Sequence, residues 1–459
     1  MPEPADSLSV LVLVGDALRR DALAMQLPSG GPTALTRRIN QSDPGWIHFD
    51  RCYAAAPWTL PASTSLLTAT DAFVHGHWSH GHTLTADSLV PCFDTAHRAA
   101  VINNGVLTGS PELARGFDPY RWIADTPESF AAAGEFLRDR AADGASYFFM
   151  VHSNLPHDYY LPAAREDYER WFPERDDFAA IGQRVIDWKG VTGEQARMRR
   201  TYDATVLRLH EEFDALIEAA SRERTIVLVL ADHGEGFEPE LARIHHGGRV
   251  HDDVVRVPCA LWLPPSVSGE KRARLADVAA HDTIGVVDLL PTLIGLVGGC
   301  PPPGLSGRDL LAVAGGLDER GGDHRRVLRI EDRRYLYLAS RLRLNTNSRG
   351  KNMTRATKLR NRTWRATLGR AHSVQGFVDG RWKLVVTEFI APNAVAPRAG
   401  SWWLARQHNG NPFVAVRGRS WFGLELFDID RDPGERTNRL LGRGDPAAVR
   451  ERVMATVDA

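Results

Sequence analysis

Three groups of polar residues follow directly after apolar runs of the sequence, and their side chains are of the kinds that bind metals. The groups are Asp16 after residues 8–14, Asp232 and His233 after residues 225–230, and His157 after residues 147–151. Carboxylates and imidazoles together suit Mn²⁺, Zn²⁺ or Mg²⁺. A single Asp or His in such a place is more often a cap or turn residue. Three in equivalent positions favour a metal site.

A hydroxyl-rich turn at residues 56–69 could supply a nucleophile. Thr59 stands two residues before Pro61, at the start of an apolar stretch that predicts a helix. The N-terminus of a helix presents N–H groups to an anion, and a bound metal lowers the pKa of a hydroxyl. Composition alone favours the simpler alternative, in which Thr59 caps a structural helix.

The runs that would position these groups are typical of a parallel sheet covered by helices. They are nearly continuous in Val, Leu, Ile and Phe, as expected for strands that are buried on both faces. The predicted strands are residues 8–14, 99–102, 147–151, 225–230 and 258–263. Between two of them, apolar residues recur at helical spacing over residues 204–220. Chemistry in such folds lies beyond the carboxyl ends of the strands, where the three polar groups stand.

Beyond a Pro- and Gly-rich stretch at residues 298–307 the pattern changes to short strands separated by turn residues. These predicted strands are residues 335–338, 376–378, 383–386 and 425–427. They predict a small antiparallel sheet. We therefore expect an α/β catalytic body over residues 1–303, with helices on both faces of a mostly parallel sheet, and a C-terminal subdomain over residues 304–459.

Charge is balanced over the whole chain but not locally. The 459 residues include 56 Lys and Arg against 57 Asp and Glu, which disfavours nucleic acid as a partner. Residues 341–370, in contrast, hold ten basic residues and no acid. This basic insertion is either a solvated loop or a surface that binds a polyanionic group.

Other features exclude several classes of protein. The four cysteines show no Cys-x-x-Cys spacing, which argues against a disulfide framework and a structural zinc site. The N-terminus has no basic segment before its apolar run, and no apolar stretch reaches the roughly 20 residues of a membrane helix. We expect a cytoplasmic protein that does not contact a membrane.

Several segments, in order along residues 8–440, resemble the sulfatase-like branch of the alkaline phosphatase superfamily. They are Asp16, the Thr59-Leu-Pro-Ala-Ser-Thr turn, Asp232-His233-Gly-Glu, His246-Gly247, Asp252-Asp253-Val-Val-Arg256-Val-Pro258, Asp288-Leu-Leu-Pro-Thr292 and the stretch from Glu425 to Asn438. The resemblance implies an alkaline phosphatase-like fold and one divalent metal ion, which could be Mn, Zn, Mg or Ca, with a second metal left open.

The resemblance also implies roles for individual residues. The metal would be held by Asp16, Thr59, Asp232 and His233. Thr59, His157 and His246 would be the catalytic residues, with either histidine protonating the leaving oxygen. Asn103, His245 and Arg249 would bind the substrate.

Two departures from the sulfatase pattern bear on the reaction. Sulfatases carry a Cys or Ser that is oxidised to formylglycine, whereas oxidation of the secondary alcohol of Thr59 would give a ketone. Ala17 stands where sulfatases have a second acidic ligand, which fits a single-metal site. Threonine nucleophiles of the superfamily belong to phosphodiesterases and phosphotransferases.

We therefore expect a metal-dependent hydrolase or transferase of small anionic phosphate or phosphonate esters that acts through phosphothreonine at Thr59. One alternative is a hydrolase of sulfate or sulfamate esters without formylglycine. The other is an inactive member of the superfamily that acts as a binding protein.

Overall fold

The chain forms two compact units, each described here by itself. The computed structural model describes residues 8–39, 45–78, 84–175, 178, 195–238, 243–314, 326–333, 373–390, 414–417 and 420–439. The first unit comprises residues 1–246 and 253–326, and the second comprises residues 247–252 and 327–459. The division falls after Arg326 rather than after residue 303, and residues 304–314 pack within the first unit. There the Leu310 N–H donates to the Thr292 hydroxyl at 3.0 Å.

The first unit is built on a seven-stranded sheet of order β2-β10-β7-β1-β6-β4-β5. The strands are β1 (Ser9–Gly15), β2 (Trp46–His48), β4 (His97–Ile102), β5 (Tyr120–Trp122), β6 (Tyr147–Ser153), β7 (Thr225–Ala231) and β10 (Cys259–Trp262). β1 runs parallel to both β6 and β7, and β10 is antiparallel to its two neighbours. The mostly parallel sheet predicted from the sequence is confirmed.

The five predicted strands of this sheet all form, within two residues of their predicted bounds. Every residue of β1, β6 and β7 is buried. Strands with apolar side chains on both faces need cover on both faces, which explains their place in the centre of the sheet. The three-residue strands β2 and β5 lie at the two edges and are too short to stand out as patterns.

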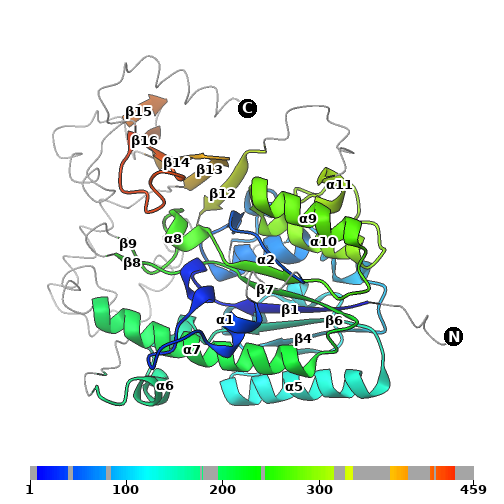
Figure 1. Ribbon diagram of the computed structural model, residues 1–459. Helices are drawn as coiled ribbons and strands as arrows, with labels where there is room; N and C mark the ends of the chain where they lie inside the picture. Colours follow the sequence, from blue (N-terminus) through cyan, green and yellow to red (C-terminus); the bar gives the residue numbers. More distant parts are fainter. Residues whose placement is uncertain are drawn as a thin grey trace, which may run out of the picture. The chain divides into compact units, whose positions relative to one another are not determined.

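Helices cover both faces of the sheet: Figure 1 shows α5 and α7 along one face and α9 and α10 along the other. The helices are α1 (Ala34–Arg38), α2 (Thr59–Thr68), α3 (Ala72–His75), α4 (Gly105–Thr108), α5 (Thr126–Asp143), α6 (Ala164–Trp171), α7 (Gln195–Ala219), α8 (Asp252–Val255), α9 (Gly269–His281), α10 (Leu289–Leu296) and α11 (Leu310–Ala314). The predicted stripe of α7, including Val206, Leu209 and Phe213, is fully buried.

Capping fixes the bounds of the helix that follows β5. The side chain of Asp125 accepts a hydrogen bond from the Glu128 N–H at the start of α5, and Gly144 ends the helix with φ of 69°. The chain then enters β6 after two further residues. In the parallel register of β1 and β6, Gly15 lies opposite Ser153, so the two strands end side by side, next to the predicted site residues.

The second unit contains a five-stranded antiparallel sheet of order β12-β13-β14-β16-β15. Its strands are β12 (Leu328–Asp332), β13 (Val374–Asp379), β14 (Trp382–Ile390), β15 (Val414–Arg417) and β16 (Ser420–Asp428). The predicted strands at 376–378, 383–386 and 425–427 fall within β13, β14 and β16. The predicted strand at 335–338 and the basic insertion at 341–370 lie outside the described residues.

Among the residues that the structure describes, no helix combines the length and the apolar character needed to cross a membrane. Two short ladders complete the first unit: β3 (Cys52–Tyr53) pairs with β11 (Ile284–Gly285), and β8 (Phe237–Glu238) pairs with β9 (Arg243–Ile244).

Candidate active site

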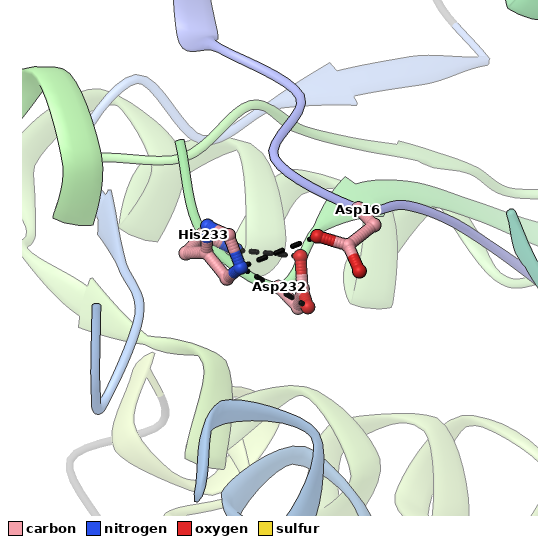
Figure 2. Close-up of side chains that lie close together, drawn as sticks. All are labelled: Asp16, Asp232 and His233. Carbon is pink, nitrogen blue, oxygen red and sulfur yellow. Dashed lines mark hydrogen bonds and ion pairs between the residues drawn. The ribbon is translucent and has the colours of Figure 1, made fainter. Parts of the chain in front are cut away.

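The ends of β1 and β7 bring three predicted metal ligands together. Asp16 follows β1 directly, and Asp232 and His233 follow β7. One ligand atom from each of the three lies within 4.8 Å of the others, and all three side chains are buried. Figure 2 shows Asp16 and Asp232 pointing toward the imidazole of His233, whose Nε2 lies 3.2 Å from Asp16 Oδ1 and 3.7 Å from Asp232 Oδ2.

The donor set of this cluster fits a divalent cation. Asp16 Oδ1 and Asp232 Oδ2 are buried and make no hydrogen bond. Buried carboxylate oxygens are otherwise almost always satisfied. The Nδ1 of His233 lies 2.9 Å from the Gly234 carbonyl, to which it can only donate, so Nε2 keeps its lone pair for a metal. Two oxygens and one imidazole nitrogen suit Mn²⁺, Zn²⁺ or Mg²⁺.

Local backbone geometry fixes Asp232 and His233. Asp232 Oδ1 accepts hydrogen bonds from the Ala17 N–H at 3.3 Å and the His233 N–H at 2.8 Å. Ala17 adopts a left-handed conformation with φ of 58°, which turns the chain directly after Asp16. Gly234 leaves room for a close approach, since a Cβ there would lie 2.4 Å from the Asp253 carbonyl oxygen.

Thr59 joins the cluster from the first residue of α2. Its hydroxyl donates to Asp16 Oδ2 at 3.2 Å and lies 3.3 Å from His233 Nε2. The residue before it, Trp58, gives the helix no side-chain cap. The first-turn N–H groups of α2 therefore point toward the end of the helix where Thr59 lies, and they favour an anion there.

An asparagine that the sequence analysis did not select reaches the cluster. The side-chain amide of Asn104 donates to Asp16 Oδ2 and, at 2.8 Å, to Asn154 Oδ1. The predicted Asn103 instead gives its amide hydrogens to the carbonyls of Ile123 and Ala124, both at 2.9 Å. Both asparagines follow β4 directly, so the expectation that site residues lie beyond the carboxyl ends of the strands would have pointed to both of them. Only the tertiary structure tells which of them faces Asp16.

Two further histidines lie next to His233. The ring of His246 is centred 4.4 Å from that of His233 and 5.1 Å from that of His157. Glu235 is fully buried and its Oε2 accepts from His246 Nδ1 at 3.2 Å, with His245 Nδ1 at 3.6 Å. Glu235 therefore orients this pair of histidines.

The electrostatics of the cluster separate these histidines. Although burial opposes it, the carboxylates of Asp232 and Asp16 raise the pKa of His233 to about 9. Burial together with the neighbouring His233 and His157 lowers the pKa of His246 to about 3, against the effect of Glu235. The pKa of His157 is raised by Asp16 and Asp158 in spite of its burial.

Burial also opposes ionisation of Asp16, but His157, His233 and His152 outweigh it and hold the pKa of this carboxyl well below its usual range. A metal would take the place of the proton on His233, because imidazole binds metals in its neutral form.

The other predicted substrate-binding residues are placed as follows. His245 is partly exposed, has φ of 60°, and lies 3.3 Å through Nδ1 from the Tyr159 hydroxyl. Arg249 belongs to the second unit, so its role stays a prediction.

Comparisons with known proteins show what the chain is similar to. Residues 108–299 match the family model described as Sulfatase. That stretch includes His157, Asp232, His233 and His246, whereas Asp16 and Thr59 precede it. This part of the chain is therefore similar to the sulfatase family. No curated protein matches the chain in sequence.

Solved structures show how much of the chain has the sulfatase-like fold. A 2-O GAG sulfatase superposes with a TM-score of 0.61 at 14% identity, over 99% of this chain and 91% of its own. A protein solved with its substrate D-glucosamine-2-N,6-O-disulfate gives 0.60 at 14% identity, over 99% and 97%. The phosphonate monoester hydrolase of Agrobacterium radiobacter gives 0.57 at 17% identity, over 98% and 95%. The sulfatase-like fold therefore extends over both units, including Asp16 and Thr59.

Proposed function

We propose that this sulfatase-like protein is a metal-dependent hydrolase or transferase of small anionic phosphate or phosphonate esters, and that Thr59 forms a covalent phosphothreonine. The observation that carries the proposal is the place of the Thr59 hydroxyl, 3.2 Å from Asp16 and 3.3 Å from His233. A hydroxyl used only as a helix cap would bond to backbone N–H groups of its own helix. This one faces the candidate metal ligands.

The chain's residues suit a two-step displacement. In the first step the Thr59 oxygen forms a bond to phosphorus while the bond from phosphorus to the ester oxygen breaks. The Thr59 proton passes to solvent. His157 gives its proton to the departing oxygen, since its raised pKa keeps it protonated more readily than its neighbour His246.

In the second step a water molecule, or an acceptor alcohol, forms the new bond to phosphorus and the bond to the Thr59 oxygen breaks. His157 takes the proton of the attacking water, and Thr59 recovers a proton from solvent. The divalent metal held by Asp16, Asp232, His233 and Thr59 would lower the pKa of the threonine hydroxyl and offset the charge on the phosphoryl oxygens. The His246 ring, held by Glu235, lies next to the rings of His233 and His157, and we propose that it contacts the transferred group.

Phosphoryl transfer is favoured over sulfuryl transfer by the chemistry of threonine. Formylglycine is an aldehyde, and a secondary alcohol cannot be oxidised to one. The likeness in fold to a phosphonate monoester hydrolase is consistent with this substrate class.

Hydrolysis of sulfate or sulfamate esters without formylglycine is the second candidate, supported by the match to the sulfatase family and by neighbours named as sulfatases. A third candidate is an inactive member of the superfamily that acts as a binding protein, which would need neither the metal nor the free Thr59 hydroxyl.

The test is to expose the full-length, metal-loaded protein to a nitrophenyl phosphodiester, a nitrophenyl phosphonate and a nitrophenyl sulfate, with and without chelator. Rapid acid quenching and peptide mass spectrometry should find one phosphoryl group on the peptide that contains Thr59. Faster turnover of the sulfate than of both phosphorus esters would overturn the substrate class. Chelator-insensitive turnover, or turnover without a modified Thr59, would overturn the mechanism.

The partner and location also belong to this proposal. A substrate with several negative charges would be recruited by the basic insertion at residues 341–370. The cytoplasmic location stays a prediction.

A further inference from the structure

His152 is a buried histidine next to the candidate metal cluster, and the proposed mechanism gives it no role. It is the sixth residue of β6, opposite Val14 of β1 and Ile102 of β4, and its side chain is completely buried. Neither ring nitrogen makes a hydrogen bond. The two nitrogens of a buried imidazole normally make hydrogen bonds. We therefore infer that the ring of His152 gains its hydrogen bond when the site binds its metal.

His152 lies close to the oxygen of Asp232 that faces the candidate metal position. His152 Nε2 lies 3.6 Å from Asp232 Oδ2, slightly beyond hydrogen-bond length. The other oxygen, Oδ1, is held by the N–H groups of Ala17 and His233. Oδ2 is therefore the oxygen left for the cation, and its second lone pair can accept a hydrogen bond from His152.

We propose that His152 is a positioning residue of the metal centre: its Nε2–H donates to Asp232 Oδ2 and fixes this carboxylate for the cation. The inference rests on the metal site of the proposed function. His152 is not grouped with the atoms of Asp16, Asp232 and His233 that lie within 4.8 Å of one another, so it acts through Asp232 rather than as a direct ligand. Partners of this kind orient the ligands of a metal site, and their loss typically weakens metal affinity by roughly 10- to 100-fold.

The structure suggests a matched pair of variants. In His152→Gln the side-chain NH₂ lies at about the place of Nε2 and can still donate to Asp232. In His152→Asn the shorter side chain places its amide near Nδ1 and cannot reach. Both variants put a neutral amide at the same buried position, so a general cost to folding should affect them alike.

The experiment measures binding of Zn²⁺ alone to the full-length protein, by competition with a chromophoric chelator and without substrate. We expect His152→Asn to bind Zn²⁺ roughly 10- to 100-fold more weakly than the parent, and His152→Gln to stay within about threefold of it. Circular dichroism and urea unfolding check that both variants fold. Equal Zn²⁺ affinity in the parent and a folded His152→Asn, or equal losses in both variants, would overturn the proposal.

Absorption of the Co²⁺-substituted protein separates a positioning role from direct ligation. The visible bands of Co²⁺ should keep their position and intensity in His152→Gln, because the ligands are unchanged. Loss of a nitrogen ligand in this variant would make His152 a direct ligand and overturn the positioning role. If the parent binds no divalent metal, the proposed function itself fails. If the parent binds Zn²⁺ but His152→Asn and His152→Gln lose the same affinity, the inference about His152 fails while the proposed function stands.

Discussion

Replacing Thr59 by valine is the sharpest test of the chemistry, because it removes one oxygen and keeps the shape of the side chain. Thr59 is 4% exposed, and its hydroxyl contacts Asp16 and His233 at 3.2 and 3.3 Å, the long end of the hydrogen-bond range. Loss of such contacts should change the free energy of unfolding by about 1 kcal/mol or less. A large loss of activity in Thr59→Val that persists at saturating metal must then come from the reaction.

The size of the loss in activity distinguishes a nucleophile from a group that only stabilises charge. Removing one stabilising hydrogen-bond donor typically lowers kcat by roughly 10²- to 10³-fold. Removing the atom that forms the covalent bond should lower kcat/KM by about 10⁴-fold or more, equivalent to about 5 kcal/mol of transition-state stabilisation. Thr59→Ser keeps a hydroxyl at the same position and should stay within about tenfold of the parent.

The assay compares initial rates of nitrophenyl phosphodiester and phosphonate hydrolysis at saturating metal. Metal affinity and unfolding curves of the three proteins are measured first, and the rates are then compared with each protein saturated with metal, because Thr59 is also a proposed metal ligand. A loss of only about a hundredfold in Thr59→Val, or equal losses in the Ser and Val variants, would refute the assignment of Thr59 as the nucleophile.

Other predictions concern stability, pH, metal and the basic insertion. Lys383 is completely buried, and its Nζ lies 2.6 Å from Asp252 and 2.8 Å from Glu435. Lys383→Met leaves these carboxylates buried without their cation, so it should lower the free energy of unfolding, measured in urea, by about 3–5 kcal/mol. Adding Asp252→Asn should recover part of the loss. No recovery in the double variant would contradict the charge argument. Burial lowers the pKa of His210 from 6.5 to about 4, so between these pH values the unfolded chain binds more protons than the folded one. The free energy of unfolding should therefore fall by up to about 3 kcal/mol as the pH drops from 6.5 to 4. His210→Gln should flatten this part of the pH profile, and an unchanged profile would count against it. Divalent metal at a hundred times its Kd should raise the free energy of unfolding by about 2.7 kcal/mol, as measured by calorimetry. Asp232→Asn, which removes a proposed ligand, should abolish this increase. Neutralising four arginines within residues 341–370 should raise KM for a multiply charged substrate and weaken its salt dependence, whereas no change in either would leave the segment a solvated loop.

The sequence by itself determined the central sheet and the ends of its strands. Continuous apolar runs such as β1 and β7 leave few alternatives to a buried parallel sheet, and the polar residue after each run must then lie at one edge. This reasoning selected Asp16, Asp232 and His233, which the fold brings within 4.8 Å. Thr59 could be placed at the same edge only through the resemblance to sulfatases, because a hydroxyl before a helix is usually a cap.

The tertiary structure decided which neighbouring side chains turn inward. Asn103 and Asn104 are equivalent in the sequence, yet the first bonds to backbone carbonyls and the second to Asp16. His152 lies within a strand whose residues are all buried, where no local pattern marks it as functional. Its meaning comes from Asp232, 80 residues away in the chain and 3.6 Å away across the sheet. The local sequence determines which residues end a strand. Which groups the side chains of those residues contact depends on segments that are distant in the sequence and come together only in the fold.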